Sequence, residues 1–152
     1  SLDAAVELAD DFLPAGAPIV TLVEADGDEE LRRSRRPPAH DLPVALLVDA
    51  RTASAAEIFA GALQHHGRAI VVGERTYGKG TAHAFGRAPS EGGSAYQLVA
   101  QCLLASGEAL QGGGVRPDRL ALTTASENVA RRALLRLRPA GVVQRESRHT
   151  ST

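Results

Sequence analysis

Aromatic side chains and cysteine are scarce in this sequence of 152 residues. Aromatic residues make up 3% of it, and neither Trp nor Met occurs. The core is therefore expected to consist of Ala, Val, Leu and Ile, with Phe12, Phe59 and Phe85 as its large members. Cys102 is the only cysteine, which excludes an intrachain disulfide and a cysteine-rich zinc site. Its apolar surroundings, Leu98 to Leu104, predict a buried thiol.

The sequence also has no long apolar run and no excess of charge of one sign. No stretch reaches the roughly 18–20 apolar residues that a membrane span needs, and the net charge is −1. We therefore expect no membrane span and no general attraction to nucleic acid. No signal peptide is visible at Ser1, so the residues leave the localisation open. The basic cluster within the charged segment is interpreted as a solvated loop, with a partner-docking or phosphate-binding patch as the alternative; it comprises Arg32, Arg33, Arg35 and Arg36.

The pattern of apolar residues predicts one domain in which helices and strands interleave, a mixed α/β architecture. Helices are expected over Leu2 to Leu13, Ser54 to Leu63 and Glu127 to Leu137. Strands are expected over Ile19 to Val23, Val44 to Val48, Ala69 to Val72, Thr81 to Phe85, Ala95 to Leu104 and Leu120 to Leu122. The continuous apolar run Val44 to Val48 indicates a strand buried on both faces. Loops are expected over Asp26 to Pro43, Pro89 to Gly93 and Ser106 to Asp118, and a disordered tail over Val142 to Thr152.

Ser54 follows a predicted strand and a short loop and stands at the start of a predicted helix. Unpaired N–H groups and the positive end of the helix dipole meet at such a position. The backbone N–H of Ala55 is therefore a candidate oxyanion donor for a carbonyl that Ser54 attacks. Serine is also a preferred N-cap residue. Both interpretations of Ser54, capping and catalysis, stay open on this local pattern.

Lys79 is the only lysine: the other 16 of the 17 basic residues are arginine. An ammonium can lose its proton in a desolvated setting, whereas a guanidinium cannot, so only Lys79 qualifies as a general base of this type. Gly78 and Gly80 flank it and allow a close approach of the backbone. Gly73 and Gly78 match the spacing of a phosphate-binding loop, but Gly80 replaces its Ser or Thr and strand-like residues follow. Nucleotide binding is therefore disfavoured.

Four ordered segments together resemble the carboxyl-terminal processing (tail-specific) serine proteases. They are Thr52 to Leu63, Val71 to Thr81, Ser106-Gly107 and Gln111 to Asp118. The opening helix, Leu2 to Pro14, is similar to the one that follows the Asn-Pro-Gly-Gly turn of that family. The resemblance covers about residues 1–124.

The resemblance implies a serine endopeptidase on a crotonase-like α/β fold that cleaves protein substrates near their C-termini. Its nucleophile falls on Ser54 and its general base on Lys79, 25 positions later. Residues 1–124 would form the catalytic core, truncated on its N-terminal side and without a PDZ-like region, and residues 125–152 a C-terminal helix and tail. No cofactor and no metal are implied. The expected partners are protein or peptide substrates, a homo-oligomer is compatible with the family, and the family indicates the bacterial periplasm or another extracytoplasmic location.

The sequence departs from the family in three ways. His83 stands where glutamine commonly orients the lysine, and it is assigned the same orienting role here. His65 stands where an acidic residue is usual. The Asn-Pro-Gly-Gly turn, which would complete the oxyanion hole, does not occur in these residues. We therefore expect this segment alone to be weakly active or inactive, since one oxyanion donor contributes about 10²–10³ in rate.

Two other classes of protein are alternatives to the peptidase. A catalytically weakened relative that acts as a binding or scaffold module is favoured by His65 and His83 and opposed by Ser54 and Lys79. An acyl-CoA enzyme of the crotonase type is disfavoured, because it has no need of a serine–lysine pair.

Overall fold

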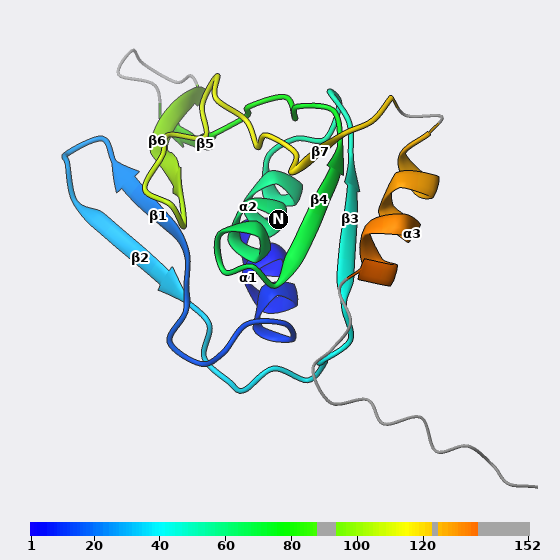
Figure 1. Ribbon diagram of the computed structural model, residues 1–152. Helices are drawn as coiled ribbons and strands as arrows, with labels where there is room; N and C mark the ends of the chain where they lie inside the picture. Colours follow the sequence, from blue (N-terminus) through cyan, green and yellow to red (C-terminus); the bar gives the residue numbers. More distant parts are fainter. Residues whose placement is uncertain (88–93, 123–124, 137–152) are drawn as a thin grey trace, which may run out of the picture.

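The computed structural model describes residues 1–87, 94–122 and 125–136 (Figure 1). Side chains are described outside residues 84–98. The expected turn Pro89 to Gly93, the polar tail Val142 to Thr152 and the side chain of Phe85 therefore lie outside the described residues. Within them, no helix is both long and apolar enough to cross a membrane.

Two sheets make up the mixed α/β fold. The antiparallel sheet has the order β2-β1-β6-β5 and comprises β1 (Pro18–Glu24), β2 (Glu29–Arg33), β5 (Thr81–Arg87) and β6 (Ser94–Leu104). The parallel sheet has the order β3-β4-β7 and comprises β3 (Val44–Val48), β4 (Ala69–Gly73) and β7 (Arg119–Leu120). The alternation of helix and strand that the sequence predicts is confirmed. A strand also follows Lys79, which agrees with the expectation that this lysine does not lie in a phosphate-binding loop.

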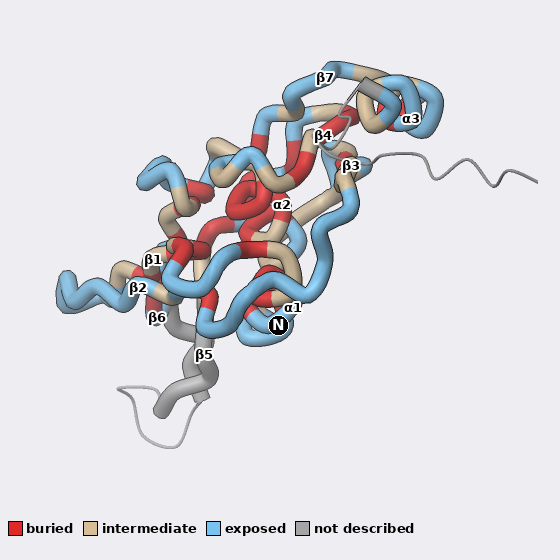
Figure 2. Tube along the Cα trace, turned by 60° about the horizontal axis from the view of Figure 1, so that its bottom comes forward, coloured by how far each residue is buried: buried red, intermediate tan, exposed pale blue. Residues whose placement is uncertain are grey.

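The helices α1 (Leu2–Asp10) and α2 (Ala55–His65) lie between the two sheets, and α3 (Ser126–Arg136) packs on β3 and β4 (Figure 1). Helix α2 contacts β1 and β6 on one side and β4 on the other, which makes it the centre of the fold. The tube coloured by burial shows this helix among the most buried segments (Figure 2). Fully buried apolar side chains close the core around it: Leu13, Ile19, Val20, Leu63, Val71, Leu110 and Val115.

Two details of the fold differ from the sequence predictions, and one is confirmed. Helix α1 ends at Asp10 rather than Leu13, because the chain tightens into a turn in which Phe12 N–H bonds to the carbonyl of Ala9 at 3.0 Å. Strand β3 is half-buried rather than buried on both faces, since it is the edge of the parallel sheet; Leu47 is 52% exposed. The buried thiol expected at Cys102 is confirmed, and burial raises the pKa of Cys102.

The segment predicted to be a charged loop contains strand β2, which is the largest error in the predicted fold. Its residues are mostly exposed, so no alternation of apolar side chains marks it. Strand β2 instead pairs with β1 in antiparallel register, with Thr21 opposite Leu31 and Val23 opposite Glu29. Backbone pairing and ion pairs therefore hold this strand in place.

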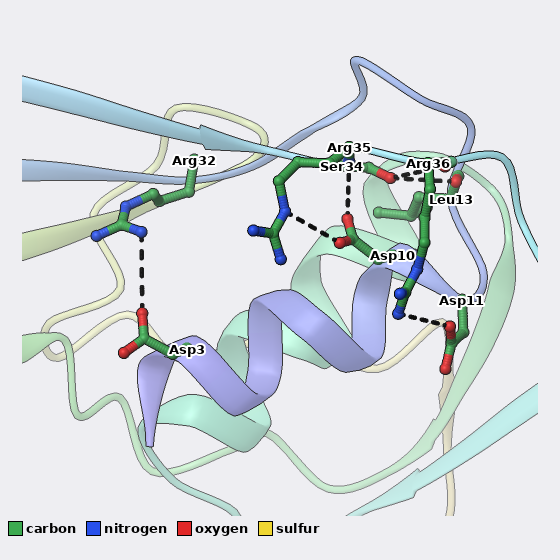
Figure 3. A network of polar contacts seen from close by, with 8 residues as sticks. All are labelled: Asp3, Asp10, Asp11, Leu13, Arg32, Ser34, Arg35 and Arg36. Carbon is green, nitrogen blue, oxygen red and sulfur yellow. Dashed lines mark hydrogen bonds and ion pairs between the residues drawn. The ribbon is translucent and has the colours of Figure 1, made fainter.

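Three of the four arginines of the basic cluster contact acidic residues of α1 and its C-cap (Figure 3). Arg35 donates from Nε to Asp10 Oδ2 at 3.3 Å and from its backbone N–H to Oδ1 at 2.9 Å. Arg36 donates to Asp11 Oδ1 at 3.0 Å, and Arg32 lies 3.8 Å from Asp3. The side chains of Arg35 and Arg36 are exposed, as a solvated segment predicts, but together with Arg32 they also join the β1–β2 hairpin to α1 through ion pairs.

Asp10 is 1% exposed and is the central acceptor of this network. Burial raises the pKa of Asp10, but the Arg35 N–H, the Ser34 hydroxyl and the Arg35 guanidinium outweigh it and hold the pKa below its usual range. A carboxyl whose folded pKa is depressed stabilises the fold above its unfolded pKa of about 3.9, and this contribution is lost as pH falls through the folded pKa.

Asp10→Asn is expected to lower the free energy of unfolding at pH 7 by about 1–3 kcal/mol, because a charged acceptor is lost from a buried site. The difference from wild type should shrink as pH falls below about 4, where the wild-type carboxyl itself becomes protonated. Urea unfolding at pH 7 and at pH 3 measures both effects. Asp11→Asn is the matched control: its ion pair is more exposed, and its effect should stay below about 1 kcal/mol. An equal effect of both substitutions would contradict the central place of Asp10.

Candidate active site

Ser54 is held by a compact turn between β3 and α2. Asp49 follows β3 directly, and its Oδ1 accepts hydrogen bonds from the N–H groups of Arg51 at 3.0 Å and Thr52 at 2.9 Å. The Thr52 hydroxyl also donates to Asp49 Oδ1 at 3.1 Å. The Thr52 hydroxyl and the Arg51 N–H hold the pKa of Asp49 below its usual value. This Asx turn fixes the path of the chain into Ser54.

Ser54 is the N-cap of α2, as the sequence predicts, and has an unusual backbone conformation. Its φ is +58° and its ψ −123°, and it is the only non-glycine residue with a positive φ in the part of the chain that the structure describes. Such a conformation is sparsely populated for a residue with a Cβ atom and is characteristic of functional sites. Capping and catalysis are compatible here, since the backbone of Ser54 takes part in the cap while its side chain is half-buried.

Lys79 lies in the loop between β4 and β5 and is exposed. This loop is tied to the Ser54 turn by a hydrogen bond from Tyr77 N–H to the carbonyl of Thr52 at 2.9 Å. Gly78 has a φ of +85°, and a Cβ atom at this position would lie 3.1 Å from backbone atoms of Gly112 and Gly114. A side chain at 78 would therefore push the loop away from the glycine-rich segment behind it.

Glu57 joins the Ser54 turn to the Lys79 loop. It is fully buried in the first turn of α2, and its Oε2 accepts the backbone N–H of Ser54 at 2.7 Å and that of Lys79 at 2.8 Å. Its Oε1 accepts the N–H of Gly78 at 2.6 Å and the hydroxyl of Thr76 at 2.5 Å. An ionised carboxylate has about four acceptor positions, and all four are filled by donors here. One buried carboxylate thus fixes the backbone of both predicted catalytic residues.

Thr76 extends this network into the glycine-rich segment. Its hydroxyl donates to Glu57 and accepts the N–H of Val115 at 2.7 Å, while its own N–H donates to the Val115 carbonyl at 3.1 Å. Gly112 N–H also donates to the carbonyl of Gly78 at 2.9 Å. The segments that carry the sequence motifs, 52–63, 71–81 and 111–118, therefore meet around one buried polar network.

The other predicted site residues occupy distinct positions. Ala55 is the first residue of α2, and no partner for its N–H lies among the described residues, which leaves this donor available for an oxyanion. His83 lies exposed on β5, next to a bulge between positions 82 and 83. His65 ends α2, and its ring stacks edge-on against His66 with centroids 4.9 Å apart. His65 is therefore at the opposite end of α2 from Ser54.

Glu57 is the site residue that the sequence interpretation missed: it lies within the segment Thr52 to Leu63, to which only Ser54 contributes a predicted catalytic side chain. A signal was available: Ser54 and Glu57 have the Ser-x-x-Glu spacing of a capping box. Its three further donors come from residues 19–22 positions later, which no local pattern reveals. No group of three metal-ligating side chains occurs among the described residues.

The sequence and the fold are similar to those of known peptidases. The model of Peptidase family S41 matches residues 1–121. A probable CtpA-like serine protease of Staphylococcus epidermidis is 35% identical over 119 residues, 77% of this chain and 24% of the relative. A carboxyl-terminal-processing protease of Picosynechococcus is 42% identical over 98 residues, 64% of this chain and 23% of the relative.

The solved structure of a photosystem II D1 C-terminal processing protease superposes with a TM-score of 0.71 at 28% identity, covering 80% of this chain and 31% of that one. The chain spans about a quarter of the length of the curated relatives it matches. The family resemblance read from the motifs is thus confirmed by the whole matched region. The chain belongs to peptidase family S41.

Proposed function

We propose that this chain is part of a serine endopeptidase in which Ser54 is the nucleophile and Lys79 the general base, and which cleaves protein substrates near their C-termini. One observation carries the proposal. Glu57 Oε2 accepts a hydrogen bond from the backbone N–H of both residues, which supports their placement at one site. The names of the similar proteins support the choice of reaction and substrate.

The reaction is acyl transfer. Neutral Lys79 takes the proton of the Ser54 hydroxyl as its oxygen attacks a peptide carbonyl. The Ala55 N–H and the positive end of the α2 dipole stabilise the oxyanion. The C–N bond then breaks, the leaving amine receives the proton from Lys79, and water hydrolyses the acyl-enzyme. Lys79 is exposed in this chain. We infer that bound substrate or other parts of the protein desolvate it, so this segment alone is expected to have little or no activity.

The finer features of the enzyme are proposals of the same kind. We propose a crotonase-like variant of the mixed α/β fold and a catalytic core that ends near residue 124, with residues 125–152 as a C-terminal extension. Helix α3 of that extension packs on β3 and β4. The proposed setting is extracytoplasmic, as the family resemblance implies, and a homo-oligomer is compatible with it.

Covalent labelling of the full protein tests the proposed chemistry. A fluorophosphonate probe is expected to modify Ser54, as found by mass spectrometry of the labelled peptide, and Lys79→Ala is expected to abolish the modification. Arg119→Ala, at an exposed basic residue outside the site, should leave labelling unchanged. Unchanged labelling in Lys79→Ala, or no labelling of the wild-type protein, would refute the dyad. The latter result would favour a binding module with a peptidase fold.

His83→Gln tests the proposed orienting role of His83. Glutamine supplies an uncharged acceptor, and the family commonly has glutamine at this position. We expect His83→Gln to retain most of the wild-type activity. Peptide hydrolysis by the full protein at neutral pH is the measurement. An inactive His83→Gln would show that histidine has chemistry of its own at this position.

A further inference from the structure

Helix α2 and the glycine-rich segment that packs on Gly78 line an open cavity of about 390 Å³. The C-terminal half of α2 contributes Gly61 and His65, and the glycine-rich segment contributes Gly113 and Gly114. Leu104 and Val115 supply apolar surface. The volume falls within the range of small-ligand pockets. None of the residues that line it has a role in the proposed reaction.

Two guanidinium groups line this cavity without a carboxylate partner in the described part of the chain. Arg75 donates from Nε to the carbonyl of Gly113 at 2.6 Å, so its bond is to a neutral group. Arg116 lines the same cavity, and no ion pair of either arginine is found among the described residues. By contrast, the arginines that bind α1 all pair with carboxylates. The cavity is therefore lined by two guanidinium groups that form no ion pair among the described residues.

The lining also limits what can bind. Glu108 is its only acidic residue, against two arginines. Guanidinium groups bind carboxylates with paired, charge-assisted hydrogen bonds. Leu104, Ala109 and Val115 would receive a short apolar group next to that charge. A peptide segment that carries a carboxylate beside apolar side chains meets both requirements.

We propose that this cavity binds a carboxylate of the peptide substrate through Arg75 and Arg116. The proposal rests on the proposed peptidase function and adds a second contact to it. The wall of the cavity is shared with the site: Gly114 N–H and Gly112 N–H belong to the segment that packs on Thr76 and Gly78, and Arg75 precedes Thr76 directly. An occupant thus contacts the segment that supports the Lys79 loop.

Isothermal titration of the full protein with short peptides tests the proposal, in a Ser54→Ala background so that no peptide is cleaved. The probes are an acetylated peptide of alanine and leucine with a free C-terminal carboxyl, its C-terminal amide, and an amide with one internal glutamate. We expect at least one carboxylate peptide to bind about 10-fold or more tightly than the plain amide. Binding of the free acid alone identifies the C-terminus as the source, and binding of the glutamate peptide identifies a side chain.

Arg116→Gln should remove this preference, because the Arg116 side chain has no partner in the fold among the described residues and its backbone carbonyl stays bonded to Gln64 at 2.8 Å. Arg119→Gln is the matched control, at an exposed arginine outside the cavity. Equal binding of all three peptides, or an unchanged preference in Arg116→Gln, would overturn the proposal. Binding is measured in Ser54→Ala, and cleavage of the same peptides is measured separately with the wild-type protein. If the peptides bind as expected but the wild-type protein does not cleave them, the proposed function is refuted and the inferred carboxylate-binding cavity stands.

Discussion

Lys79→Arg is expected to reduce peptide hydrolysis by the full protein about 10²–10⁴-fold, although it preserves the charge. Arginine cannot release its proton in a protein and therefore cannot accept the proton of Ser54. The backbone contact of position 79 with Glu57 does not depend on the side chain, so the fold of the loop should persist. Initial rates at saturating peptide, together with circular dichroism, separate a chemical loss from a structural one.

Arg51→Lys is the control for Lys79→Arg, because it exchanges arginine and lysine at another position close to Ser54. Arg51 lies in the Ser54 turn, and its side chain is 90% exposed, next to Asp49. A lysine there should keep most of the activity. If Lys79→Arg retained more than about a tenth of the wild-type rate, Lys79 would act as a fixed cation rather than as a base.

Glu57→Gln is expected to lower the free energy of unfolding by about 2–4 kcal/mol and to remove activity. Each carboxylate oxygen of Glu57 accepts two donors, so an amide NH₂ would face two donors in either orientation. The Ser54 turn or the Lys79 loop must then shift. Catalysis depends on ångström-scale placement, and a shift of this kind costs activity even where the fold survives.

Urea unfolding measures the stability of this variant, and fluorophosphonate labelling measures its site. Glu7→Gln, at an exposed position of α1, should change neither. Thr76→Val isolates one arm of the network, because it removes the hydroxyl between Glu57 and Val115 while keeping the shape of the side chain. It should cost less stability than Glu57→Gln. A loss below about 0.5 kcal/mol for Glu57→Gln would show that the network is not what holds the two segments together.

The sequence predicted two catalytic candidates but not the residue that fixes their backbones. Lys79 has a local signal, a sole lysine between glycines, whereas Ser54 at a helix start is a candidate for capping as well as for catalysis, and the family resemblance gives both residues their predicted roles. Glu57 was missed because its role comes from donors distant along the chain, which only the folded structure brings to it. Strand β2 was missed for a related reason. Arg32 of β2 pairs with Asp3 of α1, and the backbone of β2 pairs with β1. Neither contact produces a periodic pattern of apolar residues in the sequence.

The backbone conformation of Ser54 indicates that folding stability and the proposed catalytic role place opposite demands on this position. A side chain held at a φ of +58° and ψ of −123° costs roughly 1–3 kcal/mol, and glycine avoids that cost. The protein would therefore be more heat-resistant with glycine at 54, and selection for persistence of the fold alone would favour that exchange. Serine at position 54 is consistent with selection that keeps a hydroxyl in a fixed place at the expense of folding stability. Active sites are where enzymes commonly have reduced stability.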